Sequence, residues 1–158
     1  MRVPAFLPVL ALCSCGPLTS TSGPVVSFEM ATAWIYQGAD STALSVEIAR
    51  SEAQHEQGLS GRRSLDPQSG MVFQFPRVRS GDEGFWMVGA EVPLDIAFIS
   101  EDGRILRILS MDLCRSGSPA QDCPGYFPGV EYSYALETNQ GWFDRNGIGV
   151  GSRVIVVP

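Results

Sequence analysis

Short apolar runs separated by glycine and proline are the feature that most constrains the fold of this chain. Two of these runs, "ATAWIYQ" (31–37) and "ALSVEIA" (43–49), alternate apolar and polar residues and are separated by five residues. Alternation with a period of two places one set of side chains on each face of a strand. A short connection between two such runs is typical of a β-hairpin. With 17 glycines and 11 prolines available for turns, the pattern predicts a β-rich fold with short connections.

The rest of the chain continues this pattern. Ser51 and Gln54 form an S-x-x-Q capping box that predicts a short helix ending at Gly58, and 139–147 has room for one helical turn. Further strands are expected at 71–75, where Pro76 should end the strand, and at 85–87, 94–99, 104–111, 132–137 and 153–157. We therefore expect an α+β, mainly β domain: a compact, barrel-like antiparallel or mixed sheet of about seven or eight strands with one short helix.

The first residues predict export. The stretch "MRVPAFLPVLALCSCG" has one basic residue and an apolar run of about ten residues, which is too short for a stable membrane span. It resembles the signal of bacterial lipoproteins, in which a small residue precedes the acylated cysteine. Ser14 before Cys15 fits that pattern better than Leu12 before Cys13. We expect residues 1–15 to be a lipoprotein signal peptide and Cys15 to carry the lipid.

This interpretation sets the expected domain organisation and location. Residues 16–27 are a polar tether, and residues 28–158 form a single β-rich domain. Gly16 is not the aspartate associated with inner-membrane retention, so we expect the lipid to anchor the protein at the periplasmic face of the outer membrane. The alternatives are an ordinary signal peptide cut elsewhere, or a buried N-terminal helix, which the two prolines in the run disfavour.

Charge and cysteine usage narrow the function classes. The formal net charge is −6 and the chain has no lysine, so it lacks the basic face that nucleic-acid binding requires. Cys114 and Cys123 flank "RSGSPAQD", and in an oxidising compartment we expect them to form a disulfide. With one histidine and no C-x-x-C spacing, a zinc site is hard to assemble. We expect no metal and no cofactor.

Several motifs in combination resemble a known family. They are the helix and turn "ARSEAQHEQGLSGRR", the block "FWMVGAEVPLDIAF", and the late segment "LETNQGWFDRNGIGVG". Together they are similar to the domain of unknown function 192 family, over about residues 31–157. The resemblance implies a compact β-rich domain, often secreted or lipid-anchored in bacteria, and no established activity. The family pattern continues Lys-Asn-Thr after F-W-M, where this chain has Val88-Gly89-Ala90-Glu91, so a site built on that trio would lack a cation here.

The stretch 84–99, "GFWMVGAEVPLDIAFI", places Asp95 in a run that is almost entirely apolar. An ionised carboxylate in apolar surroundings is costly unless it is hydrogen-bonded or paired. Because the chain has no lysine, the expected partner is an arginine, and Arg62 or Arg63 beside the G-L-S-G-R turn are the candidates.

This pairing allows two interpretations. In one, Asp95 and Arg62 form the polar base of a ligand pocket, with Trp86 and Trp142 as apolar walls. In the other, the same pair is an internal brace and both tryptophans belong to the core. The sequence leaves both open.

Evidence for catalysis is weaker. Two carboxylates facing one cleft, Asp95 and Glu137, would be the arrangement of a glycosidase. His55 stands among polar residues and is expected to be a solvated helix residue, and "GLSG" around Ser60 falls short of the G-x-S-x-G motif. We therefore expect a non-catalytic envelope module that binds a small molecule, a glycan or an envelope protein. The alternative is a small envelope hydrolase that uses Asp95 with Glu137 or an arginine.

Overall fold

The computed structural model describes residues 26–115 and 119–158. The predicted signal peptide, its Cys15 and most of the predicted tether lie outside the described residues. The strands are β1 (Glu29–Gln37), β2 (Asp40–Ala49), β3 (Ser69–Arg79), β4 (Phe85–Trp86), β5 (Leu94–Ile99), β6 (Ile105–Met111), β7 (Gly125–Tyr126), β8 (Tyr132–Asn139) and β9 (Arg153–Val157). The helices are α1 (Glu52–Gln57), α2 (Trp142–Arg145) and the short 3-10 turn η1 (Ala120–Asp122).

Seven strands form one mixed sheet in the order β6-β5-β8-β3-β2-β1-β9, and β4 pairs with β7 in a separate two-stranded ribbon. All neighbouring pairs in the large sheet are antiparallel except β2 and β3, which are parallel. Parallel neighbours need a crossover connection, and α1 lies in it. The predicted mainly β fold with a mixed sheet of about seven strands is confirmed.

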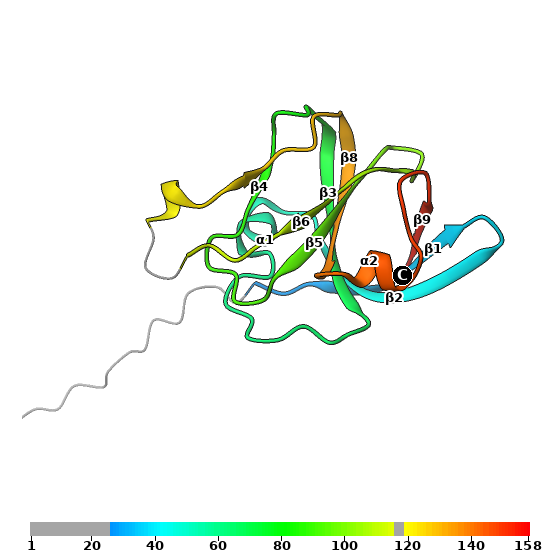
Figure 1. The fold of residues 1–158 in the computed structure, drawn as a ribbon, viewed down its shortest axis with the longest axis horizontal. Helices are drawn as coiled ribbons and strands as arrows, with labels where there is room; N and C mark the ends of the chain where they lie inside the picture. Colours follow the sequence, from blue (N-terminus) through cyan, green and yellow to red (C-terminus); the bar gives the residue numbers. More distant parts are fainter. Residues whose placement is uncertain (1–25, 116–118) are drawn as a thin grey trace, which may run out of the picture.

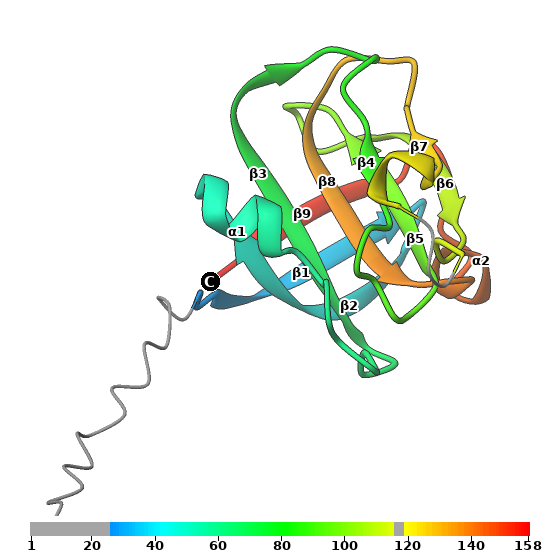
Figure 2. The ribbon, with the colours of Figure 1, turned by 90° about the vertical axis from the view of Figure 1, so that its left-hand side faces the viewer.

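The large sheet curls strongly without closing into a barrel. Figure 2 shows β1 and β9 passing behind β3 and β8 at a steep angle, so that the two ends of the sheet approach each other. Outside the named strands, a bridge between Arg104 and Arg153 links the end of the β5–β6 hairpin to β9. The predicted "barrel-like" shape is therefore a curled, open sheet (Figure 1).

Local chemistry explains most element boundaries. The Ser51–Gln54 capping box is formed, and α1 ends at Gly58, whose φ of 45° favours glycine. The β1–β2 hairpin is tighter than expected, because Gln37 pairs with Asp40. The predicted stop at Pro76 is wrong: β3 continues to Arg79, with an irregular register after Gln74 that accommodates the residue lacking an amide hydrogen.

The curl creates two separate apolar clusters, one on each face of the central strands. The inner cluster lies between β1–β2–β9 and β3–β8–β5 and is closed at one end by α2, with Trp142 and Phe143 both 1% exposed. The outer cluster covers the other face of β3, β8 and β5, where Leu59 after α1 and Met87 after β4 pack on it. All six residues of β5 are buried, because both of its faces are covered.

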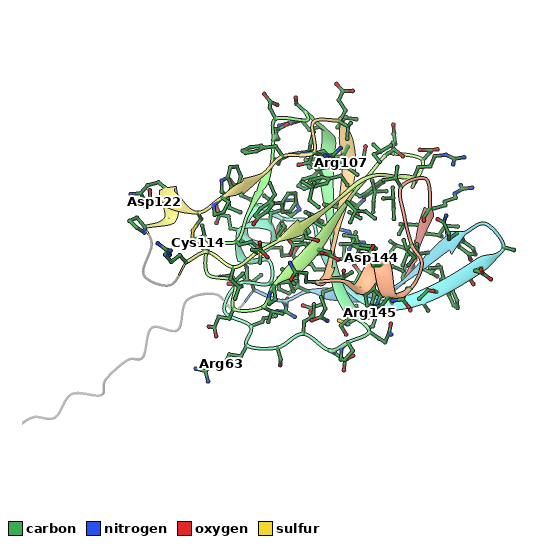
Figure 3. The ribbon with its side chains drawn as sticks, viewed as in Figure 1. Arg63, Arg107, Cys114, Asp122, Asp144 and Arg145 are labelled. Atoms are coloured by element: carbon green, nitrogen blue, oxygen red, sulfur yellow. A yellow bond between two sulfur atoms is a disulfide. The ribbon has the colours of Figure 1, made fainter. Side chains whose placement is uncertain are left out.

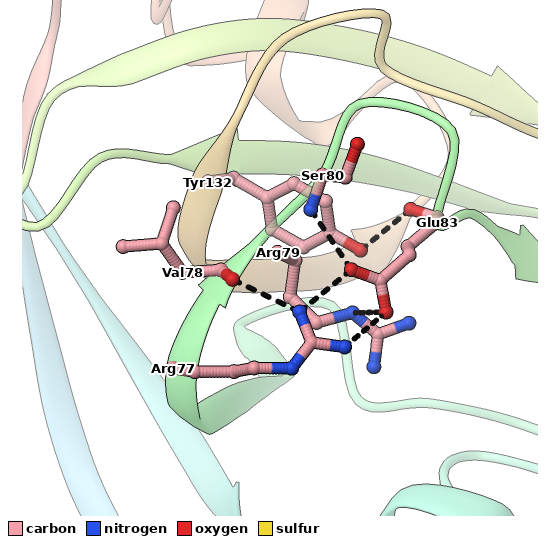
Figure 4. A network of polar contacts seen from close by, with 6 residues as sticks. All are labelled: Arg77, Val78, Arg79, Ser80, Glu83 and Tyr132. Atoms are coloured by element: carbon pink, nitrogen blue, oxygen red, sulfur yellow. Dashed lines mark hydrogen bonds and ion pairs between the residues drawn. The ribbon is translucent and has the colours of Figure 1, made fainter.

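An ion-pair cluster fixes the loop between β3 and β4. The Glu83 carboxylate accepts hydrogen bonds from Arg77 at 2.6 and 2.8 Å and from the Ser80 amide at 2.9 Å, and Arg79 lies 3.3 Å from it (Figure 4). The hydrogen bonds from Arg77 are the main cause that lowers the pKa of Glu83 to about 2. Tyr132 of β8 donates a hydrogen bond to the Glu83 carbonyl at 2.7 Å. Arg77 and Arg79 thus have a structural partner in this loop.

Cys114 and Cys123 are bonded to each other, with Cα atoms 5.2 Å apart. The bond joins the chain just after β6 to the end of η1, at the edge of the molecule where Figure 3 labels Cys114.

Neither η1 nor β7 was expected from the sequence, because elements of two or three residues are too short to show a period. Across residues 26–115 and 119–158, no helix has the length and apolar character needed to cross a membrane.

Candidate functional site

The strand register separates the two carboxylates that the sequence suggested as a pair. In β8, Glu137 lies opposite Ile96 of β5, whereas Asp95 lies opposite Thr138. Directly opposite residues in an antiparallel pair point to the same face, and adjacent residues point to opposite faces. Asp95 therefore projects into the inner face of the sheet and Glu137 into the outer face. Asp95 and Glu137 therefore do not face one cleft as the two carboxylates of a glycosidase would.

Asp95 is 3% exposed and both of its carboxylate oxygens have partners. Ser110 of β6 donates its hydroxyl to Oδ1, and the backbone amide of Gly141 donates to Oδ2, each at 2.7 Å. Gly141 precedes α2 and has a φ of 75°, which favours glycine. Asp95 thus holds the turn into α2 against the sheet, and this geometry favours the interpretation of Asp95 as a brace.

The expected pairing of Asp95 with an arginine is wrong. Arg62 forms a two-pronged ion pair with Glu47 of β2, in which Nη2 and Oε2 lie 2.7 Å apart. This hydrogen bonding raises the pKa of the Arg62 guanidinium. Arg63 extends into solvent (Figure 3), with its nearest carboxylate oxygen, on Glu91, at 3.8 Å. Glu47 of β2 is better placed than Asp95 of β5 to pair with Arg62 in the turn after α1. Sequence spacing could not show this, because it does not reveal which strand lies beside the turn.

The two tryptophans named as pocket walls lie in different places. Trp142 belongs to the inner cluster, and its indole nitrogen donates to Gln68 Oε1 at 3.3 Å. Trp86 of β4 is 54% exposed and packs edge-to-face on Phe127, with ring centroids 5.7 Å apart. Only Trp86 is accessible to a ligand.

A small cavity of about 70 Å³ lies on the outer face and contains Glu137 in its lining. We call it the Glu137 cavity. Its walls come from α1 and the turn after it, from Phe73 of β3, and from the segment 85–90. Trp86 and Val88 are exposed at its rim, whereas Phe73 and Met87 are buried in its walls. Of the five sequence candidates, the structure brings Glu137 and Trp86 together here.

Glu137 is the unusual group in this cavity. Its side chain is 6% exposed, and within residues 26–115 and 119–158 no hydrogen bond reaches its carboxyl group. Burial raises the pKa of Glu137 to about 8, because an ionised carboxylate loses the stabilisation of water. A buried acid with no partner beside an opening to solvent is a functional-site candidate.

Four further polar residues of the Glu137 cavity were not candidates in the sequence analysis: His55, Glu56, Gln57 and Ser60. His55 is half-buried rather than solvated, and its Nε2 lies 3.0 Å from the Ala49 carbonyl and 3.1 Å from the Gln74 carbonyl. Two acceptors at Nε2 require that nitrogen to carry the proton. The capping box placed His55 on a helix, but only the crossover from β2 to β3 turns that helix onto the sheet.

This hydrogen bonding also bears on catalysis. A histidine that activates a serine must face the hydroxyl with a free ring nitrogen. The Nε2 of His55 is bonded to backbone carbonyls, and no hydrogen bond joins either ring nitrogen of His55 to Ser60 or Glu137 in the described chain. The Glu137 cavity therefore has no assembled nucleophile–base pair. The described residues also contain no group of three or more potential metal ligands.

A larger cavity of about 430 Å³ lies at the open end of the curled sheet, on the inner face. Its size suits a small ligand better, and three of its polar side chains are already paired with one another: Arg50 pairs with Glu29 and also donates to Gln74 at 3.0 Å. Size favours this cavity, whereas the Glu137 carboxyl group favours the other one. We give more weight to Glu137, because this acid is only 6% exposed and receives no hydrogen bond from the described residues beside an opening to solvent.

Comparison with known proteins establishes the family. The profile of DUF192, described as an uncharacterized ACR, matches residues 34–156. The chain belongs to the DUF192 family. Among solved structures, it is similar to a Sinorhizobium meliloti 1021 protein that has been suggested to be a transcription regulator, with 30% identity, a TM-score of 0.73, and coverage of 84% of this chain and 98% of that one.

A second solved structure shares the fold. It is a protein of unknown function from Novosphingobium aromaticivorans DSM 12444, with 24% identity, a TM-score of 0.68, and coverage of 90% of this chain and 99% of that one. A search of curated proteins found no match. The family match and the two solved structures thus support the fold, and they name no ligand.

The segment in which this chain departs from the DUF192 pattern borders the Glu137 cavity. Val88 and Ala90 line it, and Gly89 between them has a φ of 74°. The Gly89 carbonyl accepts a hydrogen bond from the Gly61 amide at 2.8 Å, which holds the segment against the turn after α1. The residues at the rim are thus apolar in this chain.

Proposed function

We propose that this DUF192 protein is a lipid-anchored binding module of the bacterial cell envelope, and that its ligand enters the Glu137 cavity. The observation that carries the proposal is the Glu137 carboxyl group, nine-tenths buried and without a hydrogen-bond partner in the described chain. A neutral side chain of similar size would be more stable between Met71 and Ile96, its neighbours across the sheet. A costly group beside an opening to solvent is best explained by a ligand.

Binding fits this geometry better than catalysis. Of the two carboxyl groups that line the cavity, Glu137 is buried and Glu56 is exposed on α1, whereas Asp95, the second acid of the sequence analysis, projects from the opposite face of the sheet. The exposed aromatic side chains of Trp86 and Phe127 beside the cavity supply a surface for the remainder of a ligand. The envelope location is supported by the lipoprotein-like first 16 residues.

Native mass spectrometry of the full-length chain, gently extracted from bacterial envelopes, tests the proposal. We expect a discrete adduct on the parent protein that is missing from Glu137→Gln and retained by Asp95→Asn, provided that both variants are folded by circular dichroism. An adduct that survives in Glu137→Gln would place the ligand elsewhere, in the first instance in the larger cavity. A parent protein with no adduct after exposure to envelope extracts would contradict the binding function.

A further inference from the structure

The charges around the Glu137 cavity point to the chemistry of its ligand. Fourteen residues line the cavity, and none of them is an arginine or a lysine. Arg62, in the turn that follows the cavity residue Ser60, is committed to Glu47 by two hydrogen bonds. The chain contains no lysine at all. No arginine or lysine of the described lining therefore supplies a positive charge to Glu137.

The walls of the cavity favour a cation as well. Trp86, at the rim, presents an indole that is half exposed, and aromatic faces attract ammonium groups. Phe73 and Phe85 also line the cavity, which keeps water away from the carboxyl group and strengthens an ion pair formed there. A buried carboxylate and an aromatic surface are a combination that recognises alkylammonium groups.

Size limits the group that enters. A cavity of about 70 Å³ holds only a few non-hydrogen atoms. A compact primary ammonium with part of its alkyl chain fits this space, whereas the rest of a larger ligand would lie on the exposed apolar surface of Trp86, Val88 and Phe127. The net charge of −6 would favour the approach of a cationic ligand over longer distances.

We propose that the Glu137 cavity binds a primary alkylammonium group, with the Glu137 carboxylate as its ion-pair partner and Trp86 packed on its alkyl chain. This inference rests on the proposed function and names the ligand class of the same site. A free amine and the side chain of a lysine in a partner protein share this chemistry.

Binding of an ammonium group is coupled to the release of a proton from the Glu137 carboxyl group. Burial raises the pKa of the free carboxyl group to about 8, so at neutral pH it must lose its proton before the ion pair forms. The dissociation constant is therefore expected to be about tenfold weaker at pH 7 than at pH 9, where an alkylamine is still protonated. The other titratable groups that face the cavity are His55 and Glu56 of α1, and Glu47 lies on the next strand but one.

The experiment uses 5-fluorotryptophan in the full-length chain and follows its three signals by fluorine NMR during titration with n-butylammonium chloride. We expect saturable shifts of the Trp86 signal, assigned with Trp86→Phe, with a dissociation constant on the order of millimolar at pH 9. Glu137→Gln should weaken binding at least tenfold at pH 9. His55→Gln and Glu56→Gln should keep the tenfold difference between pH 7 and pH 9.

Neutral 1-butanol is the matched probe. Binding of 1-butanol as tight as that of butylammonium, equal butylammonium binding at pH 7 and pH 9, or no saturable shift of Trp86 would each overturn the inference. An adduct that depends on Glu137 in the mass-spectrometric experiment, together with failure of butylammonium, would leave the proposed function standing and its ligand class wrong. Absence of both the Glu137-dependent adduct and butylammonium binding would show that the Glu137 cavity is not a binding site.

A third probe separates the two sources of the ammonium group. Nα-acetyl-lysine N-methylamide presents the same group on a peptide backbone, and its Nε-acetylated form removes the charge. Tighter binding of the lysine derivative than of butylammonium supports a lysine side chain of a partner protein, and equal binding supports a free amine. Binding of the Nε-acetylated form as tight as that of the charged form would overturn the inference.

Discussion

At the scale of single residues, Asp95 and Glu137 show how differently two buried acids can be accommodated by one sheet. Asp95 has a hydrogen bond on each oxygen, from Ser110 and Gly141, whereas Glu137 has none from the described residues. Hydrogen bonds to a carboxylate stabilise its charged form, and burial without them destabilises it. The first acid contributes to folding, and the second makes folding depend on pH.

The pH dependence follows from Glu137. Its pKa is about 8 in the folded protein against an ordinary value of 4.5, so between these values the unfolded chain releases a proton that the folded protein keeps. The free energy of unfolding therefore falls as pH rises, by up to about 1.4 kcal/mol per pH unit. Glu137→Gln removes this dependence, and urea denaturation of both proteins from pH 4 to pH 9 should show the variant gaining relative stability with pH. A constant difference across this range would contradict the assignment.

Asp95 predicts a loss of stability without a loss of ligand. Asp95→Asn cannot accept both hydrogen bonds with the same strength, and we expect a decrease of about 1–3 kcal/mol in the free energy of unfolding at pH 7. Glu101→Gln, which changes an exposed carboxyl group just beyond the same strand, is the control and should change stability by less than about 0.5 kcal/mol. Equal urea midpoints for Asp95→Asn and the parent would show that the brace contributes nothing.

At the scale of elements, the sequence predicted the strands and helices whose bounds are determined by a local residue pattern. The strands at 94–99 and 153–157 were predicted at their observed bounds, because their apolar runs are framed by turn residues. The capping box of α1 was likewise local. Strand β4 was expected at 85–87, whereas β7 has two residues and no readable period, so the β4–β7 ribbon was not predicted.

The candidate site depended on pairings that a single sequence does not contain. Glu137 and Trp86 were named as candidates from their motifs, but their shared cavity arises from the docking of α1 and the segment 85–90 on the outer face. The sequence analysis paired Arg62 with the wrong carboxylate. In the sequence, Glu47 looked like one more polar position of a strand, and only the folded sheet brings it to Arg62. Register across strands decides such partners, and a one-residue change reverses the face.

The disulfide is an element-scale feature with a measurable effect. It closes a short loop, with Cys114 and Cys123 nine positions apart, and the chain-entropy model gives a stabilisation of about 2.7 kcal/mol for a loop of this length. The double variant Cys114→Ser/Cys123→Ser should unfold at a lower urea concentration by a corresponding amount. The parent protein in reductant should match the variant, and an unchanged midpoint in both would show that the loop is held by other contacts.

At the scale of the whole molecule, the open curl of the sheet gives the protein two unlike faces. The inner face holds the larger cavity and the brace to α2, and the outer face holds the Glu137 cavity beside exposed Trp86 and Phe127. A closed barrel would bury its inner face completely. In this open sheet, α1 and the β4–β7 ribbon cover the outer face. The elements that complete the outer core also form the walls of the proposed site, so its shape and the stability of that core are linked.

The proposed location gives the last prediction. If Cys15 carries the lipid, each acyl methylene buried in the membrane contributes about 0.8 kcal/mol to anchoring, and loss of the acyl chains should release the domain. Cys15→Ala should abolish incorporation of labelled palmitate and move the protein out of the membrane fraction, whereas Cys13→Ala, two positions away in the same stretch, should leave both unchanged. Continued labelling of Cys15→Ala would contradict the assignment of Cys15, and an unlabelled parent chain would contradict the anchor altogether.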